Sequence, residues 1–431
     1  MNDSKMKELL APDFSTRPWW ADAMVTPILP AEVPAKVDVA VIGAGYTGMS
    51  AALAAARGGR EVIVFEAGTV SSGCSARNGG QMSSSVRPEW EGLSHRFGEA
   101  AAQGIVEGIH ASYNFVRDFT RAEGIDCDYA ETGHFVAAHR PNRMKGLEAW
   151  AAGQRRMGHD VEVVSAADQA RYVDTPSFHG GAIVRNWGAL HPAKLLDGMI
   201  AKAQEAGVRI IENTRVDAVK ESAGGMLLQV GGRQILARDV VVGTNGYTSS
   251  ATPWLRRRLI PLSTYIVTTE ALDPARVRAL FPSDAMVFDT RKMLSYCRAT
   301  PDGKHVLFGT RAPYDPANPA SSVPIAHANL VRDFPALKGV KIGRGWGGIV
   351  GFTFDEMPHL GSRGHMHYAA GYCGRGIAMA SWMGNCLGRR LAGEAAANPF
   401  DVAPMKTMPL YTGTPWFIQP MFAAYRVKDM F

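Results

Sequence analysis

The chain has 431 residues, of which 46% are hydrophobic and 20% charged, and this composition is typical of a folded globular protein with two or three domains. Its formal net charge is +6, and the basic residues are dispersed except for the Arg-Arg-Arg run at residues 256–258. We interpret that run as a solvated turn and expect no nucleic-acid partner. Five cysteines without a CxxC pair indicate neither a disulfide framework nor a metal site.

The first residues lack the apolar core of a signal peptide, and no stretch of ~20 apolar residues could span a membrane. We therefore expect a cytoplasmic protein without a membrane span; the sequence gives no indication of its oligomeric state. Residues 1–36 are expected to form an extended arm. This arm should pack on the body of the protein, because the pair Trp19 and Trp20 would be costly to expose.

A βαβ unit is predicted directly after this arm. Residues 37–42 are an apolar run that ends at a glycine, which is typical of a buried parallel strand. Residues 46–57 have the composition of a helix, and residues 61–65 form a second apolar run that is closed by Glu66. The two strands, the glycine turn and the helix fit within about 30 residues, as such a unit requires.

The middle of the chain changes character. Residues 96–123 have a helical pattern, whereas residues 260–350 are mostly strand and favour an antiparallel sheet over further βαβ repeats. A last buried strand at 365–370 leads into a glycine-rich turn and a helix over 377–391. We predict an α/β fold with an α+β insertion, in which a Rossmann-type domain carries an antiparallel-sheet substrate domain. The expected division is an arm (1–36), a discontinuous dinucleotide-binding domain (37–90, 160–258 and 345–395), a substrate domain (91–159 and 259–344) and a C-terminal extension (396–431).

The turn after the first strand reads Gly43-Ala-Gly45-Tyr-Thr-Gly48, a G-x-G-x-x-G motif. Gly43 allows a tight turn, Gly45 lets the backbone approach a pyrophosphate, and Gly48 lets the helix pack on the strand. Glu66 lies 23 residues after Gly43, where a carboxylate can accept the hydroxyls of an adenosine ribose. The alternative is a structural glycine turn, but the strand and helix context favours a dinucleotide site.

The same pattern occurs a second time at residues 343–348. No helix follows it, and no strand with an acidic end comes about 20 residues later. We therefore do not interpret this second copy as a binding fingerprint, and it shows that the bare motif is weak evidence.

NAD and FAD share their ADP half, which is the part that this motif binds, so the motif does not distinguish the two cofactors. The loop at residues 75–81 (SARNGGQ) offers hydrogen-bond donors and bare backbone where a long cofactor would continue past its pyrophosphate. A surface turn rich in Gly and Asn is the alternative interpretation of this loop.

With these residues the chain resembles the D-amino-acid oxidase superfamily of FAD-dependent oxidoreductases. The likeness rests on the GAGYTG motif (43–48), Glu66, the SARNGGQ loop (75–81) and the GYCGRG turn (371–376), and it spans roughly residues 15–395. The branch that it resembles most is the γ-glutamylputrescine oxidoreductase-like one. The resemblance implies FAD contacts at Gly43, Gly45, Tyr46, Thr47, Gly48, Glu66, Ala67, Ser75, Arg77, Asn78, Gly79, Gly80, Gln81, Val216, Thr244, Asn245, Gly246, Gly347, Gly348, Gly374, Arg375, Gly376, Ile377 and Ala378.

The resemblance also implies an activity. It implies FAD-dependent oxidation of an amine C–N bond to an imine that water hydrolyses, with electrons passed to O₂ or another acceptor. The expected substrate is a primary or secondary amine with a remote carboxylate; an N-methyl or D-amino acid and a non-catalytic FAD-binding subunit remain alternatives. Some sarcosine oxidases attach FAD to a cysteine in a stretch comparable to residues 347–356, which holds no cysteine here, so we expect non-covalent FAD.

Five residues are candidates for the lining of the substrate site. Tyr265 and Tyr296 lie on predicted strands that could face the flavin, although both could equally be core aromatics. Arg298 is two residues from Tyr296, hence on the same face of the strand, and could bind a substrate carboxylate or a surface partner. Trp346 could wall the pocket, and Arg375 could flank the flavin edge at the start of the last helix.

Overall fold

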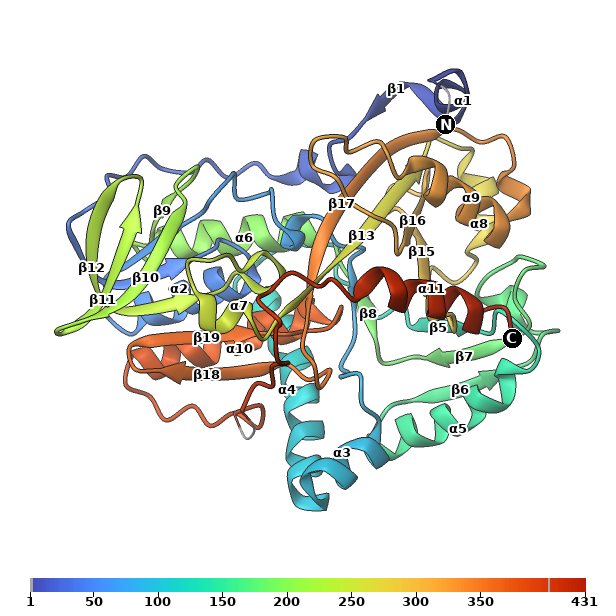
Figure 1. Cartoon of the computed structure of the whole chain (residues 1–431). Coiled ribbons are helices and arrows are strands. Elements are labelled where there is room, and N and C mark those ends of the chain that lie inside the picture. Colours follow the sequence, from blue (N-terminus) through green and yellow to red (C-terminus); the bar gives the residue numbers. More distant parts are fainter. Residues whose placement is uncertain (1–2, 402–403) are drawn as a thin grey trace.

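Strand pairing sorts the chain into an eight-stranded sheet, a nine-stranded sheet and a short two-stranded sheet in the computed structural model, which describes residues 3–401 and 404–431. Figure 1 shows the two large sheets in different halves of the molecule, with the long strand β17 running between them. The chain passes from one half to the other several times, so each half is assembled from segments that are far apart in the sequence.

The eight-stranded sheet has a parallel centre in the order β19-β12-β2-β3-β9, with antiparallel additions at its edges. Its strands are β2 (Lys36–Ile42), β3 (Val62–Phe65), β9 (Arg209–Ile211), β10 (Val216–Ser222), β11 (Gly225–Val230), β12 (Arg233–Val242), β18 (His359–Arg363) and β19 (Met366–Ala370).

Both faces of this sheet are buried, which explains why the last four residues of β2, 39–42, are all apolar. Val39 and Val41 pack against helix residues such as Met49, while the alternate residues Ala40 and Ile42 pack in a separate core on the opposite face. A parallel sheet that is covered on both sides is the usual frame of a dinucleotide-binding domain.

Helices α2, α6 and α10 pack together over one face of this sheet, and α4 packs on α10. The helices of the chain are α1 (Asp3–Leu9), α2 (Tyr46–Arg57), α3 (Trp90–Phe97), α4 (Glu99–Ala122), α5 (Arg143–Arg156), α6 (Pro192–Glu205), α7 (Pro253–Arg256), α8 (Pro274–Leu280), α9 (Val323–Asp333), α10 (Gly376–Leu391) and α11 (Ile418–Lys428). The single helix expected at 96–123 is two helices, because Gly98 adopts a φ of 81° between α3 and α4.

The nine-stranded sheet is mainly antiparallel, with parallel pairs at β1–β17 and β14–β5. Its strands, in spatial order, are β1 (Leu10–Ser15), β17 (Ile342–Phe352), β13 (Ile260–Thr269), β16 (Val306–Thr310), β15 (Ser295–Ala299), β14 (Met286–Asp289), β5 (His134–Ala137), β7 (Gly181–Val184) and β6 (Val161–Val164). Helices α8 and α9 cover one face, with Leu280 and Leu330 in a core shared with Val267 and Phe308. The two-stranded sheet pairs β4 (Gln81–Met82) with β8 (Gly188–Ala189).

The predicted fold class is confirmed, although the two large sheets do not follow the predicted domain division at three strands. Strands β6 and β7 and most of β17 fall within segments assigned to the dinucleotide-binding domain, yet they hydrogen-bond in the nine-stranded sheet. Local sequence patterns predict that a strand exists, whereas the partner of that strand depends on tertiary pairing. The exact division into domains stays a prediction.

The N-terminal arm packs on the body, although it is less extended than expected. It begins with α1 and β1, and the latter pairs with β17. Trp20 is fully buried, and its ring meets that of His191 at 4.7 Å between centroids. The arm is further held by the Asp197 carboxylate, which accepts hydrogen bonds from the amides of Val25 and Thr26.

Within residues 3–401 and 404–431, no helix has the length and apolar character needed to cross a membrane. The same residues contain no cluster of three or more His, Cys, Asp or Glu side chains that could hold a metal ion.

Candidate active site

One elongated cavity of about 590 Å³ lies where the two large sheets meet, and its size is within the ~300–1,000 Å³ typical of small-molecule sites. One end is lined by residues at the carboxyl ends of the parallel strands, including Glu66 and Val216. The other end is lined by residues of the nine-stranded sheet and its connections, including Tyr296 on β15 and Arg311, which follows β16. We call these the dinucleotide end and the sheet end.

The dinucleotide end is built on the turn between β2 and α2. Gly43 has a φ of 97°, and a Cβ on Gly48 would stand 1.9 Å from the Gly43 carbonyl oxygen, so this helix can approach the strand only with glycine at 48. A Cβ on Gly45 would stand 2.8 Å from the Ser75 hydroxyl oxygen, which is too close for a side chain. Glycine at this position therefore leaves bare backbone beside the cavity. The front of α2 therefore faces the cavity as a site for phosphate groups.

Glu66 closes this end. Its carboxylate accepts hydrogen bonds from the amides of Ala44 (2.9 Å) and Gly68 (3.0 Å), which fixes it at the end of β3. A carboxylate held in this way is in place to accept ribose hydroxyls.

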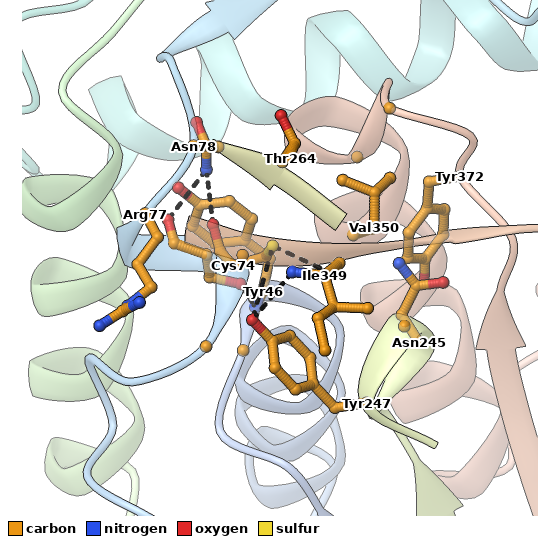
Figure 2. Close-up of a pocket in the computed structure, with 18 of the residues that line it drawn as sticks. Tyr46, Cys74, Arg77, Asn78, Asn245, Tyr247, Thr264, Ile349, Val350 and Tyr372 are labelled. Atoms are coloured by element: carbon orange, nitrogen blue, oxygen red, sulfur yellow. Dashed lines mark hydrogen bonds between the residues drawn. The ribbon is translucent and has the colours of Figure 1, made fainter. Parts of the chain in front are cut away.

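The loop of residues 74–81 lines the cavity, and Figure 2 shows Cys74, Arg77 and Asn78 of this loop. The Asn78 side-chain amide donates to the carbonyls of Cys74 and Ser75, and its carbonyl accepts from the Gly80 amide, so one side chain organises the whole loop. Arg77 donates from Nη1 to the Gly347 carbonyl oxygen at 2.7 Å. Its Nε is buried and lacks a hydrogen-bond partner among the residues that the structure describes.

That unpaired nitrogen, together with the glycine cradle, is a test of whether a cofactor fits. A buried donor without an acceptor is costly, and an acceptor on a bound dinucleotide would satisfy Arg77 Nε. The front of α10 adds further free donors, because its N-cap residue Arg375 makes no side-chain capping bond and Gly376 and Ile377 line the cavity. An anionic ring edge would be stabilised there. The residues present therefore fit FAD.

Two cysteines, Cys74 and Cys373, line the cavity. The Cys74 thiol donates to the Ile349 carbonyl oxygen and lies near the Tyr247 hydroxyl (Figure 2), and the Cys373 thiol donates to the Gly371 carbonyl oxygen. Burial raises the pKa of both thiols, which keeps them in the protonated, poorly nucleophilic form.

The sheet end has an aromatic wall and a basic rim. His134, Trp187 and Phe288 line the wall, with the His134 ring edge-on to the other two at 5.3 and 6.3 Å. His134 donates from Nε2 to the Gly188 carbonyl oxygen, and burial lowers the pKa of its imidazole to about 4. The ring is thus neutral at physiological pH, and it is a poor general base.

The basic rim consists of Arg87, Arg311 and Arg375. The guanidinium groups of Arg87 and Arg311 lie 5.4 and 5.7 Å from the centre of the Phe352 ring, and Arg375 donates to the Ser85 hydroxyl. Across the described ranges, Glu356 is the one carboxylate that pairs with any of the three, at 3.0 Å from Arg87.

Arg311 has neither a hydrogen bond nor an ion pair within the described part of the chain. Burial lowers the pKa values of Arg311 and Arg375, the latter to about 10, and both stay cationic at neutral pH. The rim therefore carries more positive than negative charge and can accept an anionic group.

Most of the predicted cofactor residues line the cavity: Gly43, Gly45, Tyr46, Thr47, Glu66, Ala67, Ser75, Arg77, Asn78, Gly79, Gln81, Val216, Thr244, Asn245, Gly246, Gly347, Gly348, Gly374, Arg375, Gly376 and Ile377. Their contacts with FAD stay predictions. Gly48, Gly80 and Ala378 lie outside the lining: Gly48 packs on Gly43, Gly80 lies under the Leu190 carbonyl, and Ala378 is buried within α10.

Of the five candidate substrate-site residues, Tyr296 and Arg375 line the cavity and the other three do not. Tyr265 is corrected to a core position: its hydroxyl donates to the Pro319 carbonyl at 2.6 Å, while its neighbours Thr264 and Ile266 face the cavity. Adjacent residues of a strand point to opposite faces, and the sequence did not indicate which face is inward.

Arg298 and Trp346 are also corrected to supporting roles. Arg298 is 7% exposed and donates to the Leu190 carbonyl oxygen; two residues along the strand place it beyond Tyr296, behind Gly80. Trp346 is buried beneath the loop and donates to the Arg77 carbonyl oxygen at 2.9 Å.

Sequence reasoning did not single out the aromatic wall, or Arg87 and Arg311 of the rim. These residues come from separate elements, and no local motif connects them. The run of small residues around Ser83 and Ser85, directly after the SARNGGQ loop, was the one available signal, since the cavity continues along it.

The fold and the cavity together define a dinucleotide-binding oxidoreductase with a substrate site built on a second sheet. Residues 38–390 match the model of the family described as DAO, FAD dependent oxidoreductase. The chain belongs to this family, it is an FAD-dependent oxidoreductase, and its cofactor is FAD.

Several characterised proteins are similar over most of the chain. Gamma-glutamylputrescine oxidoreductase of Escherichia coli is 30% identical over 361 residues, which cover 83% of this chain and 84% of that protein. Glycine oxidase of Geobacillus kaustophilus is 25% identical and covers 86% of this chain and 96% of its own. Its crystal structure superposes with a TM-score of 0.70 at 21% identity over 87% of this chain and 99% of that chain. The structure of L-proline dehydrogenase from P. horikoshii gives a TM-score of 0.69 at 18% identity, over 90% of this chain and 99% of that chain.

Proposed function

We propose that the chain oxidises a C–N bond of a primary or secondary amine that carries a remote carboxylate, of the γ-glutamylputrescine class. The observation that carries this proposal is the basic rim. Its three guanidinium groups line the cavity, and one carboxylate, that of Glu356, pairs with one of them. The similarity to gamma-glutamylputrescine oxidoreductase supports it, since that relative is 30% identical.

Bound FAD would supply the two-electron acceptor for oxidation of the C–N bond to an imine. Water then hydrolyses the imine to a carbonyl compound and ammonia if the substrate is a primary amine, or an amine if it is a secondary amine. The residues of this chain hold the substrate in position for that step. Arg311 and Arg375 would bind the carboxylate, and the aromatic wall of His134, Trp187 and Phe288 would exclude water from the amine-bearing carbon. The electrons leave to O₂ or to another acceptor.

The substrate preference is tested by paired amines. Wild-type enzyme should turn over γ-glutamylputrescine with a higher kcat/KM than putrescine, which lacks the carboxylate. An Arg311→Gln variant should lower kcat/KM for γ-glutamylputrescine by about 30-fold, because one charge-assisted hydrogen bond is lost. In the same variant, kcat/KM for putrescine should stay within about twofold of the wild-type value.

Arg278→Gln is the matched control, because Arg278 lies on α8 with a 63% exposed side chain. The proposal fails if Arg311→Gln affects both amines equally, or if a D-amino acid or an N-methyl amino acid is the best substrate in the same panel.

We also propose that FAD is bound non-covalently. The raised pKa values of the Cys74 and Cys373 thiols support this, because attachment needs a thiolate. Acid precipitation should leave the yellow chromophore in the supernatant; a yellow pellet would contradict this proposal.

A further inference from the structure

The turn that joins β14 to β15 forms part of the sheet end of the cavity. Phe288 and Tyr296 line the cavity on either side of this turn, and Leu294 lines it from the turn itself. The turn therefore shapes the region in which the proposed function places the substrate, and the inference below rests on that function for the identity of this region.

Two aspartates hold the backbone of this turn. Asp289 accepts hydrogen bonds from the amides of Arg291 (3.0 Å) and Ser295 (3.3 Å). Asp429 accepts from the next two amides, those of Lys292 (2.7 Å) and Met293 (2.8 Å), with one carboxylate oxygen each.

The two carboxylates differ in where they come from. Asp289 lies at the end of β14 and is buried, whereas Asp429 follows the C-terminal helix α11, 136 residues from Met293 along the chain. Helix α11 lies beyond the region that matches the family model, which ends at residue 390. Figure 1 shows it lying across the half of the molecule that holds β5 and β7.

The end of the chain is anchored at a second place. Asn142 donates to the Phe431 carbonyl oxygen at 3.0 Å, and Arg143 donates to that of Lys428 at 3.3 Å. Phe422 is the one buried residue of the helix within the described part of the chain. Because Phe422 is the one buried residue of α11, the polar contacts at 428–431 contribute to holding this helix against the turn.

The C-terminal segment of residues 418–431, which we call the tail, also affects the charge of the basic rim. Burial lowers the pKa of Arg311, and Asp429 and Tyr425 of the tail oppose this effect by favouring its charged form. The tail thus holds the turn by hydrogen bonds and adds a negative charge that favours the charged form of Arg311, the arginine that the proposed function assigns to the substrate carboxylate.

From these contacts we infer that Asp429 is a positioning residue for the substrate site: by bridging the amides of Lys292 and Met293, it fixes the turn that places Leu294 in the cavity wall. The C-terminal extension is in this way a working part of the site, although Asp429 itself does not line the cavity.

The test compares FAD-loaded wild-type enzyme with Asp429→Ala and Asp429→Asn. Hydrogen exchange of the 290–296 peptide should become about tenfold faster in Asp429→Ala, because two charge-assisted hydrogen bonds are lost. Quenching of flavin fluorescence by acrylamide should increase about twofold as the wall loosens. The KM for γ-glutamylputrescine should rise about tenfold while kcat changes less than twofold.

Asp429→Asn keeps one acceptor oxygen and should fall between the wild type and the alanine variant in all three measurements. Arg426→Ala is the matched control, since Arg426 lies on the exposed side of α11, and it should behave as the wild type. Unchanged exchange at 290–296 overturns the inference. So does faster exchange with unchanged quenching and unchanged KM, which would leave Asp429 a purely structural role.

The two proposals fail separately. If no carboxylate-bearing amine reduces the wild-type enzyme, the proposed function is wrong, while hydrogen exchange and acrylamide quenching still decide the role of Asp429.

Discussion

At the scale of single residues, the dinucleotide end of the cavity is held by short-range contacts that a motif can encode. Glu66 is 23 residues from Gly43, yet its carboxylate accepts the amide of Ala44, the residue that follows Gly43. Strand, turn and helix bring these groups together without help from the rest of the chain. The sequence therefore predicts this end of the site well.

Replacement of Glu66 by Gln tests that end directly. The variant should raise the Kd for FAD by about tenfold, since a neutral amide makes weaker hydrogen bonds to the ribose hydroxyls than a carboxylate does. Titration of the apoprotein with FAD, followed by flavin fluorescence, measures the change. Glu61→Gln is the control, because Glu61 is an exposed carboxylate that pairs with Arg209. Equal affinities for the wild type and Glu66→Gln would remove Glu66 from the cofactor site.

At the scale of elements, the sequence predicts strands and helices but not which face of each strand is turned inward. Thr264 and Ile266 line the cavity and Tyr265 does not. Side chains alternate between the two faces of β13, and the face that carries Tyr265 points away from the cavity rather than into it. Arg311 follows the strand β16 and meets Arg87 only through tertiary packing. No local pattern contains that information, and so the substrate end was largely missed.

The contact between α2 and α10 is the element-scale feature that most directly supports the cofactor site, since the N-terminal ends of both helices line the cavity. Glycines at 384 and 388 allow it: a Cβ there would stand 2.3 Å from the Thr47 carbonyl oxygen and 2.4 Å from that of Ala51. The two backbones therefore approach more closely than alanine permits.

Gly388→Ala should push these helices apart at a cost of about 1–3 kcal/mol. We expect a lower Tm and faster loss of FAD on dialysis. The control is Gly104→Ala on α4, where a Cβ would meet nothing within 4 Å; it should leave Tm unchanged or raise it slightly, because alanine favours helix. A Gly388→Ala protein as stable as the Gly104→Ala protein would contradict the tight packing of α2 on α10.

At the scale of the whole molecule, buried histidines determine how stability depends on pH. Burial lowers the pKa values of His134, His139, His159 and His191 from 6.5 to about 4. The unfolded chain therefore binds more protons than the folded chain between pH 6.5 and 4, and the stabilising effect of these neutral rings is lost as the pH falls through that window. Asp289 acts in the opposite direction, since burial raises the pKa of its carboxyl to about 6.

The four histidines outnumber this aspartate, so the unfolded chain takes up more protons than the folded chain near pH 5, and the free energy of unfolding should decrease as the pH falls there. Thermal unfolding of the holoenzyme at a fixed FAD concentration should give a Tm that falls steadily from pH 7 to pH 5. His159→Gln should make this dependence shallower by about one proton. A Tm that is constant or rises on acidification would show that these rings are not buried as neutral groups.

The central claim is that the cavity binds a carboxylate-bearing amine next to FAD. Anaerobic titration of the holoenzyme with this amine tests the claim most directly. Addition of γ-glutamylputrescine should abolish the visible absorption of the oxidised flavin at substrate concentrations where putrescine leaves that absorption intact. If the flavin stays oxidised with γ-glutamylputrescine, or if putrescine reduces it equally well, the assignment of the basic rim to a substrate carboxylate is wrong.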